Sequence, residues 1–167
     1  MTRFKLFLFV FGLGVAIDQL VKIWTRDAMP IGGSVHGLPW PGVFELTLTY
    51  NKGIAFGMMQ GSGVFMTPVA VAIAVGAGWY SYTHLQENDW AHTAMGLLAA
   101  GAIGNLYDRL IHGRVTDMFW FRLIDFPVFN IADACITVAT VLLMAVWWKD
   151  ATRQKASGVA SDGSNAS

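Results

Sequence analysis

Apolar residues fall into four long runs along the chain, separated by stretches in which polar residues, glycine and proline gather. A helix needs about 20 mostly apolar residues to cross a bilayer. Four segments approach or exceed that length, and we predict that each is a membrane-spanning helix: 4–24, 63–83, 91–107 and 131–148. The pattern of these runs therefore predicts an all-α membrane protein, and the connections between the runs predict a small β element.

The residues that interrupt these runs differ from one run to the next. The second run carries no charge, and the fourth carries only Asp133, near its start. The third is rich in glycine and alanine, which let helix backbones approach closely in lipid. Trp147 and Trp148 end the fourth run, where aromatic side chains suit the membrane interface.

The first run has an alternative interpretation as a cleavable signal peptide, because Arg3 and Lys5 precede its uncharged part. No small-x-small cleavage site follows, however, and Asp18 and Lys22 continue a helical pattern. We therefore expect this run to be retained as a span.

Two connections have the alternating pattern of half-buried strands. In 43–50 the polar residues Glu45, Thr47 and Thr49 share one face, and 115–121 alternates in the same way. Before the first of these segments, Gly32, Gly33, Pro39, Pro41 and Gly42 are typical of turns. Because both predicted strands lie on the same side of the membrane, we expect them to pair in a small sheet that caps the helix bundle.

Composition supports a membrane protein and excludes other classes. Of 167 residues, 54% are hydrophobic and only 13% are charged, against about 25% in soluble domains. Eleven basic and eleven acidic residues cancel, which disfavours a nucleic-acid partner. The single cysteine excludes an internal disulfide and a Cys-based zinc site, and four scattered histidines disfavour a zinc protease.

The predicted organisation is one membrane domain over residues 1–150 and a disordered cytoplasmic tail over residues 151–167, which is rich in Ala, Ser and Gly. An even number of spans places both termini on one side. Five basic residues fall on that side and five on the other, so the positive-inside rule does not decide. We expect cytoplasmic termini, because several basic residues of the opposite side lie among candidate functional residues.

The ionisable residues near the ends of the runs are the functional candidates, since charges are costly near hydrocarbon. Asp18 and Lys22 share one helix face, either as a neutralising pair or as part of a site. Asn105 and Arg109 share a face at the end of the third run, where helix-end solvation is the simpler explanation. Gly101 and Gly104 precede them, and we expect these glycines to leave open space beside that face.

Two carboxylates flank the connection 118–132. Asp133 and Asn130 suit the first turn of a helix, as N3 and N-cap residues. Asp117 shares a strand face with apolar residues, where a carboxylate needs a partner. If the chain between them turns back, the two acids meet, and such a pair can share a proton and activate water, as in aspartic proteases. Spacing alone leaves Asp108 and Asp125 as further candidates.

Four ordered blocks of sequence resemble the bacterial lipoprotein signal peptidase family, also called signal peptidase II. The blocks are 18–22 (Asp-Gln-x-x-Lys), 51–57 (NKGIAFG), 101–117 (GAIGNLYDR and GRVTD) and 126–133 (FPVFNIAD). Small departures stand at Val21 and Met118, neither of which touches the candidate acids. The resemblance covers nearly the whole chain from Asp18 to Ile136.

The resemblance implies a four-transmembrane-helix bundle with an extracytoplasmic β-sheet cradle. It implies that Asp117 and Asp133 are a catalytic dyad, and that the remaining residues bind substrate or support the acids: Asn51, Gly53, Gly101, Asn105, Arg109, Asn130, Ala132, Asp18 and Lys22. The implied reaction is cleavage of the peptide bond before a diacylglyceryl-cysteine in a prolipoprotein, without metal or cofactor. The implied location is the bacterial cytoplasmic (inner) membrane, with membrane lipids as neighbours, and we expect a monomer.

The alternative class of protein is a small membrane transporter or channel component. Its ion or proton path would use Asp18, Lys22, Arg109 and Asp133. Such a path predicts charges spread across the membrane, whereas these gather at one face. The apolar segment after Gly53 suggests either a short lid or a surface-anchoring loop.

Overall fold

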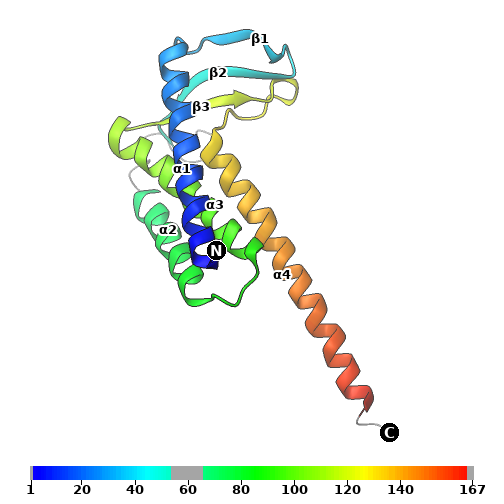
Figure 1. The fold of residues 1–167 in the computed structure, drawn as a ribbon. Coiled ribbons are helices and arrows are strands. Elements are labelled where there is room, and N and C mark those ends of the chain that lie inside the picture. The colour runs from blue at the N-terminus through cyan, green and yellow to red at the C-terminus, as the bar shows by residue number, and fades with distance from the viewer. Residues whose placement is uncertain (1, 54–65, 165–167) are drawn as a thin grey trace.

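The computed structural model describes residues 2–53 and 66–164. In these residues four helices meet a small antiparallel sheet, which lies across one end of the bundle (Figure 1). The helices are α1 (Arg3–Ala28), α2 (Met66–Thr83), α3 (Asp89–His112) and α4 (Ile131–Ser164), and the strands are β1 (Ser34–Trp40), β2 (Phe44–Asn51) and β3 (Val115–Trp120). A short 3-10 turn, η3 (Arg122–Ile124), follows β3.

Helix α3 is the central element and packs against each of the other three helices. Its small residues make this possible, because a Cβ atom at Gly96 would meet Val10 and the carbonyl of Phe7 on α1. The core between the helices is built from small and aromatic side chains: Phe7, Ala77, Ala94, Met95, Ala99 and Leu143. The close approach predicted for the third apolar run is therefore confirmed.

The ends of α3 are set by local chemistry. Asn88 caps the first turn by accepting a hydrogen bond from the backbone nitrogen of Ala91 at 3.0 Å. Gly113 ends the helix in a left-handed conformation, with φ of 66°. The helix is therefore longer at both ends than the apolar run 91–107 on which its prediction rested.

The sheet has the strand order β1-β2-β3, and both neighbouring pairs are antiparallel. Thr49 pairs with Asp117, and Leu46 pairs with Phe119, so the predicted pairing of the two alternating segments is confirmed. Of the residues predicted to form turns, Gly32, Pro41 and Gly42 lie in turns, whereas Pro39 lies in β1. A proline is tolerated there because β1 is an edge strand, and Gly42, with φ of 75°, lies in the tight turn into β2.

The polar face of β2 is buried, which simple alternation does not explain. Glu45 is 3% exposed, and its Oε1 accepts from Arg122 Nη1 at 2.9 Å and from the backbone nitrogen of Gly42 at 2.8 Å. This carboxylate therefore ties the β1–β2 turn to the segment after β3.

Helix α4 continues well beyond the predicted span, through Ser164. Composition predicted disorder from residue 151, but 151–156 (ATRQKA) contains good helix formers that extend the last turns of α4. The single domain over 1–150 stays a prediction.

Among the described residues, α1 and the part 131–153 of α4 are long and apolar enough to cross a membrane. The glycine, tryptophan and tyrosine residues of α2 and the polar residues of α3 lower their hydropathy. The full count of four spans therefore stays a prediction.

Candidate active site

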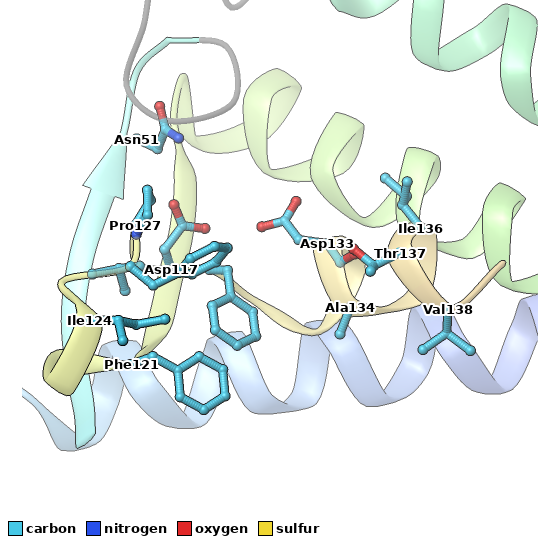
Figure 2. A pocket seen from close by; sticks show the side chains of 13 residues that line it. Asn51, Asp117, Phe121, Ile124, Pro127, Asp133, Ala134, Ile136, Thr137 and Val138 are labelled. Atoms are coloured by element: carbon cyan, nitrogen blue, oxygen red, sulfur yellow. The ribbon is translucent and has the colours of Figure 1, made fainter. Parts of the chain in front are cut away.

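Asp117 and Asp133 line the same cavity, whose volume is about 670 Å³. Asp117 comes from β3 and Asp133 from the first turn of α4, and Figure 2 shows the two carboxyl groups pointing toward each other. Two residues that lie 16 positions apart in sequence thus form one site.

The chain between the acids turns back onto β3. Phe129 pairs with Phe119 in an isolated antiparallel bridge, with N–O distances of 2.9 Å in both directions. Met118 also donates to the carbonyl of Phe129, at 3.0 Å. This return places the start of α4 beside β3, as the turn-back predicted for this connection requires.

Asp133 is held by a reciprocal cap at the start of α4. Its backbone nitrogen donates to Asn130 Oδ1 at 3.0 Å, and its Oδ2 accepts from the Asn130 backbone nitrogen at 3.2 Å. The capping role predicted for this pair is confirmed. A third bond comes from α3, since Asn105 Nδ2 donates to Asp133 Oδ1 at 2.8 Å.

Asn130 joins the two acids through its side-chain amide. Its Nδ2 donates to Asp117 Oδ1 at 2.6 Å and to Asn105 Oδ1 at 3.0 Å. The side chain is fully buried, so no water replaces these bonds. Sequence reasoning found the cap but had no signal for this second contact.

The environment of Asp117 favours its protonated form. Burial raises the pKa of this carboxyl from 3.8 to about 7, and the nearby negative charge of Asp133 adds to the increase. Hydrogen bonds from Asn130 and Asn51 and the charge of Lys22 act in the opposite direction. Near neutral pH both the protonated and the ionised form of Asp117 are therefore populated, which suits proton transfer.

Asp18 and Lys22 lie behind the acids and do not line the cavity. Lys22 Nζ is 2.9 Å from Asp18 Oδ2, so the predicted i, i+4 pair is formed, and it is fully buried. Lys22 also donates to Asn105 Oδ1 at 3.0 Å, while Asp18 Oδ1 accepts from the backbone nitrogen of Ala132 at 2.9 Å. The pair thus fixes the Asn105 amide and the first turn of α4.

The two other candidate acids have different positions. Asp108 is buried at the junction of α3 and β3, where it accepts from the backbone nitrogen of Thr116 at 2.8 Å and lies 3.7 Å from Arg26. Asp125 is exposed and ends η3 in a left-handed conformation. Neither lines the cavity, whereas Asp117 and Asp133 both do.

The expectation of open space beside Gly101 and Gly104 is wrong. A Cβ atom at Gly101 would meet the Ala132 carbonyl and the Ile136 side chain, and one at Gly104 would meet Asp18. Both glycines are needed because α4 and α1 pack directly on α3 at these points. Ala132 is fully buried in this contact.

Arg109 and Asn51 lie at the edge of the site. The Arg109 guanidinium makes two long contacts, to the carbonyls of Asn105 at 3.4 Å and Gly53 at 3.5 Å. Its buried Nε has no hydrogen-bond partner among the described residues. Asn51 lines the cavity, and its Oδ1 accepts from the Gly53 nitrogen at 2.9 Å. The predicted lid after Gly53 lies outside the described residues.

The rest of the cavity wall is mostly apolar, and sequence reasoning did not name it. Aromatic and aliphatic side chains from the 121–129 return form one side, and α4 forms the other with Ala134, Ile136, Thr137 and Val138. Spacing on α4 offered a signal, because Ile136 and Thr137 follow Asp133 at the helical intervals of three and four. The two acids therefore lie in a cavity with mostly apolar walls.

The fold and the site define a helical protein with paired, unequal carboxyl groups above an apolar cavity. Two solved structures of bacterial membrane enzymes share this fold, with TM-scores of 0.81 and 0.76 and 30% sequence identity in each case. The first match covers 88% of this chain and 90% of the other, and the second covers 86% and 93%. The class is thus that of a membrane enzyme.

Sequence comparison identifies the family. The family model described as signal peptidase (SPase) II matches residues 10–149. A lipoprotein signal peptidase of Gloeobacter violaceus is 39% identical over 79% of this chain and 75% of its own length. One of Streptococcus pneumoniae is 32% identical over 81% of this chain and 88% of its own. The chain belongs to the signal peptidase II family, which makes it a protease and disfavours the transporter alternative.

Proposed function

We propose that this protein is an aspartic endopeptidase that removes the signal peptide from prolipoproteins, by cleaving the peptide bond before a diacylglyceryl-cysteine. The observation that carries the proposal is the pair of facing carboxyl groups in one apolar cavity, with the pKa of Asp117 raised to about 7. Unequal acids in one site are the arrangement that general acid–base hydrolysis needs.

The two acids have different roles in the proposed reaction. Asp133 accepts hydrogen bonds from Asn105 and from the Asn130 backbone, which suits it to hold negative charge and to take a proton from water. The hydroxide formed attacks the scissile carbonyl carbon while protonated Asp117 gives its proton to the carbonyl oxygen. When the C–N bond breaks, the proton on Asp133 passes to the leaving amine, and one hydroxyl group of the intermediate returns its proton to Asp117 as the carboxylic acid forms.

The supporting residues act through the acids or on the substrate. Lys22 and Asn130 both donate to Asn105 Oδ1, and this fixes the amide so that its nitrogen faces Asp133. Asn51 lines the cavity, and Arg109 contacts Gly53 beside it, so we propose that both side chains donate hydrogen bonds to the substrate backbone. The apolar walls suit acyl chains and an apolar signal segment.

Exposed aromatic side chains support membrane placement. Trp79, Tyr82 and Trp90 lie on helix ends remote from the sheet, Trp147 and Trp148 lie in the middle of α4, and Trp24 and Tyr107 lie near the sheet. From Trp90 to Tyr107 the rise along α3 is roughly 26 Å, close to the thickness of a bilayer core. We therefore propose four spans, a sheet at the extracytoplasmic face of the cytoplasmic membrane, cytoplasmic termini and a monomeric enzyme.

Cleavage of a lipidated precursor by the purified, reconstituted chain tests the proposal. Asp117→Asn and Asp133→Asn keep side-chain shape but remove the transferable proton or the base, so each should lower kcat by about 1,000-fold or more. Asp125→Asn is the matched control and should cleave like wild type, because Asp125 lies outside the cavity. Cleavage that is retained in Asp117→Asn or Asp133→Asn, together with loss of cleavage in Asp125→Asn, would contradict the assignment of Asp117 and Asp133 as the catalytic pair.

A further inference from the structure

A second cavity lies at the end of the helix bundle that is remote from the sheet. Its volume is about 320 Å³, within the range of about 300–1,000 Å³ that is usual for small-molecule sites. Asn88 and Trp90 at the start of α3 form one wall, and α4 forms the other, as their positions in Figure 1 allow. This cavity shares no lining residue with the cavity of the two acids, so it is a separate site.

The α4 wall of this cavity changes from apolar to charged along the helix. Its residues are, in chain order, Leu142, Ala145, Val146, Lys149, Asp150 and Arg153. Leu142, Lys149 and Arg153 follow at intervals of seven and four, so they share one face of α4. The cavity therefore has an apolar part, on the side toward the acids along α4, and a basic rim beyond it.

The basic rim carries charge that is available to a ligand. Lys149 and Arg153 are exposed, and neither forms an ion pair with any residue that the structure describes. Arg3, at the same end of the bundle, is by contrast paired with Asp89 at 3.2 Å. With Asp150 included, the lining keeps one net positive charge, which complements a ligand with one negative charge.

The position of this cavity along α4 corresponds to a membrane interface. Trp90 in its wall is exposed, and so are Trp147 and Trp148 next to Lys149. Tryptophan is enriched at the boundary between hydrocarbon and lipid headgroups. Since the cavity lies at the last turns of the candidate span 131–153, its apolar part lies at the depth of hydrocarbon and its basic rim at the depth of the headgroups.

We propose that this cavity binds an anionic phospholipid, with the phosphodiester between Lys149 and Arg153 and an acyl chain against Leu142 and Val146. The inference rests on the membrane placement in the proposed function and adds to it a lipid site at the opposite end of the bundle from the acids. A zwitterionic lipid brings an ammonium group that the basic rim repels, so the charge of the cavity favours a lipid with a net negative charge. A soluble phosphate would leave the apolar wall uncovered.

Native mass spectrometry of the purified full chain tests this site, because it counts bound lipids and needs no cleavage. Phosphatidylglycerol and phosphatidylethanolamine with identical acyl chains are titrated into the protein in detergent, and phosphatidylglycerol should bind severalfold more tightly. Lys149→Gln and Arg153→Gln should each weaken its binding about fivefold. Lys5→Gln is the matched control and should leave the affinity unchanged, since Lys5 is exposed near the start of α1 but does not line the cavity.

Asp150→Asn should change the affinity in the opposite direction. This variant removes the negative charge from the cavity lining, so phosphatidylglycerol should bind severalfold more tightly. Damage to the fold would not produce such a gain. A loss of affinity in Asp150→Asn would contradict the electrostatic basis of the site.

Three results would overturn the proposal. Equal binding of the two lipids would exclude selection by charge, and an equal loss of affinity in Lys5→Gln would indicate general attraction to basic residues. Glycerol phosphate that binds as tightly as phosphatidylglycerol would assign the cavity to a soluble anion. In the same spectra, a dimer that is lost in Lys149→Gln would assign it to a second copy of the chain.

Cleavage of the lipidated precursor separates this inference from the proposed function. Lys149 follows Asp133 on α4 by a rise of roughly 24 Å, so Lys149→Gln in detergent should cleave at the wild-type rate. Absence of cleavage by the wild type contradicts the proposed function, whereas the lipid affinities alone decide whether the cavity binds an anionic phospholipid.

Discussion

At the scale of single residues, the Asn130 side chain links the start of α4 to the acids. Its Oδ1 caps α4, and its Nδ2 contacts both Asp117 and Asn105. The cap is a local contact of three residues, whereas the bonds to Asp117 and Asn105 join three different elements. One residue therefore serves helix formation and the position of the acids together.

Asn130→Ser separates these two roles. Serine is also a good N-cap, so Asn130→Ser should lose less stability than Asn130→Ala, by about 1 kcal/mol. Neither variant donates to Asp117, so both should lose most of their cleavage. Thermal unfolding in detergent and kcat on the lipidated precursor measure the two effects. If Asn130→Ser cleaves at the wild-type rate, the amide contact with Asp117 has no part in catalysis.

The raised pKa of Asp117 makes stability and cleavage depend on pH. Between its unfolded value of 3.8 and about 7, the folded protein keeps a proton that the unfolded chain has lost. Stability therefore falls as pH rises through this window, and Asp117→Asn should remove that decrease. Cleavage by the wild type should decline as pH rises through about 7, where Asp117 loses its proton.

Melting temperatures of wild type and Asp117→Asn from pH 4 to pH 8, with kcat/KM of the wild type, check both expectations. Parallel melting curves for the two proteins, or cleavage that is constant up to pH 9, would show that Asp117 is ionised at neutral pH.

At the scale of elements, the packing of α3 depends on positions without a side chain. Gly101 lies against the Ala132 carbonyl and Ile136, so the start of α4 rests directly on the α3 backbone. This contact holds Asp133 opposite Asn105, and the distance between the two helices therefore sets the geometry of the acid.

Gly101→Ala should destabilise the protein and lower cleavage, because the added methyl group pushes α4 away from α3. The expected loss is about 1–3 kcal/mol. Gly76→Ala on α2 is the matched control, since nothing lies within 4 Å of its added Cβ. There the better helix propensity of alanine should stabilise by up to about 1 kcal/mol. Thermal unfolding compares the two, and equal effects would mean that α4 shifts freely at Gly101.

The strands of the sheet differ in how well the sequence pattern predicts them. Alternation predicted β2 and β3, because their side chains face two environments. It missed β1, whose pairing with β2 is made by backbone groups that do not depend on the residue type. Glu45 is buried on the predicted polar face for a similar reason, since Arg122, far along the chain, compensates its charge.

At the scale of the whole molecule, the proposed orientation has consequences outside the site. Asp117 and Asp133 lie at the sheet end of the bundle, and the N-terminus lies toward the other end (Figure 1). If the enzyme acts on secreted precursors, the sheet end faces away from the cytoplasm and both termini face into it.

A reporter enzyme that is active only in the cytoplasm should therefore work when fused after Ser167, because four spans return the chain to that side. One that is active only outside should work when inserted in the segment 32–41, between α1 and β2. The tie of basic residues means that charge does not already imply this result. The reverse pattern would place the acids in the cytoplasm and contradict the peptidase proposal.

The sequence by itself determined the helices, two of the three strands, the cap formed by Asn130 and Asp133, and the pair Asp18 and Lys22. These features depend on neighbours within about four residues, so periodicity and residue type are enough to predict them. The ordered motifs also pointed to the family.

Only the tertiary structure decided which carboxylates meet. Asp108 and Asp125 are closer to Asp117 along the chain than Asp133 is, and the meeting of Asp117 with Asp133 depends on the bridge between Phe119 and Phe129. The glycines of α3 show the same limit of sequence reasoning. The sequence shows that a side chain is absent at these positions, but not which helix packs against them. Burial, which raises the pKa of Asp117, is likewise a property of elements brought together from distant parts of the chain.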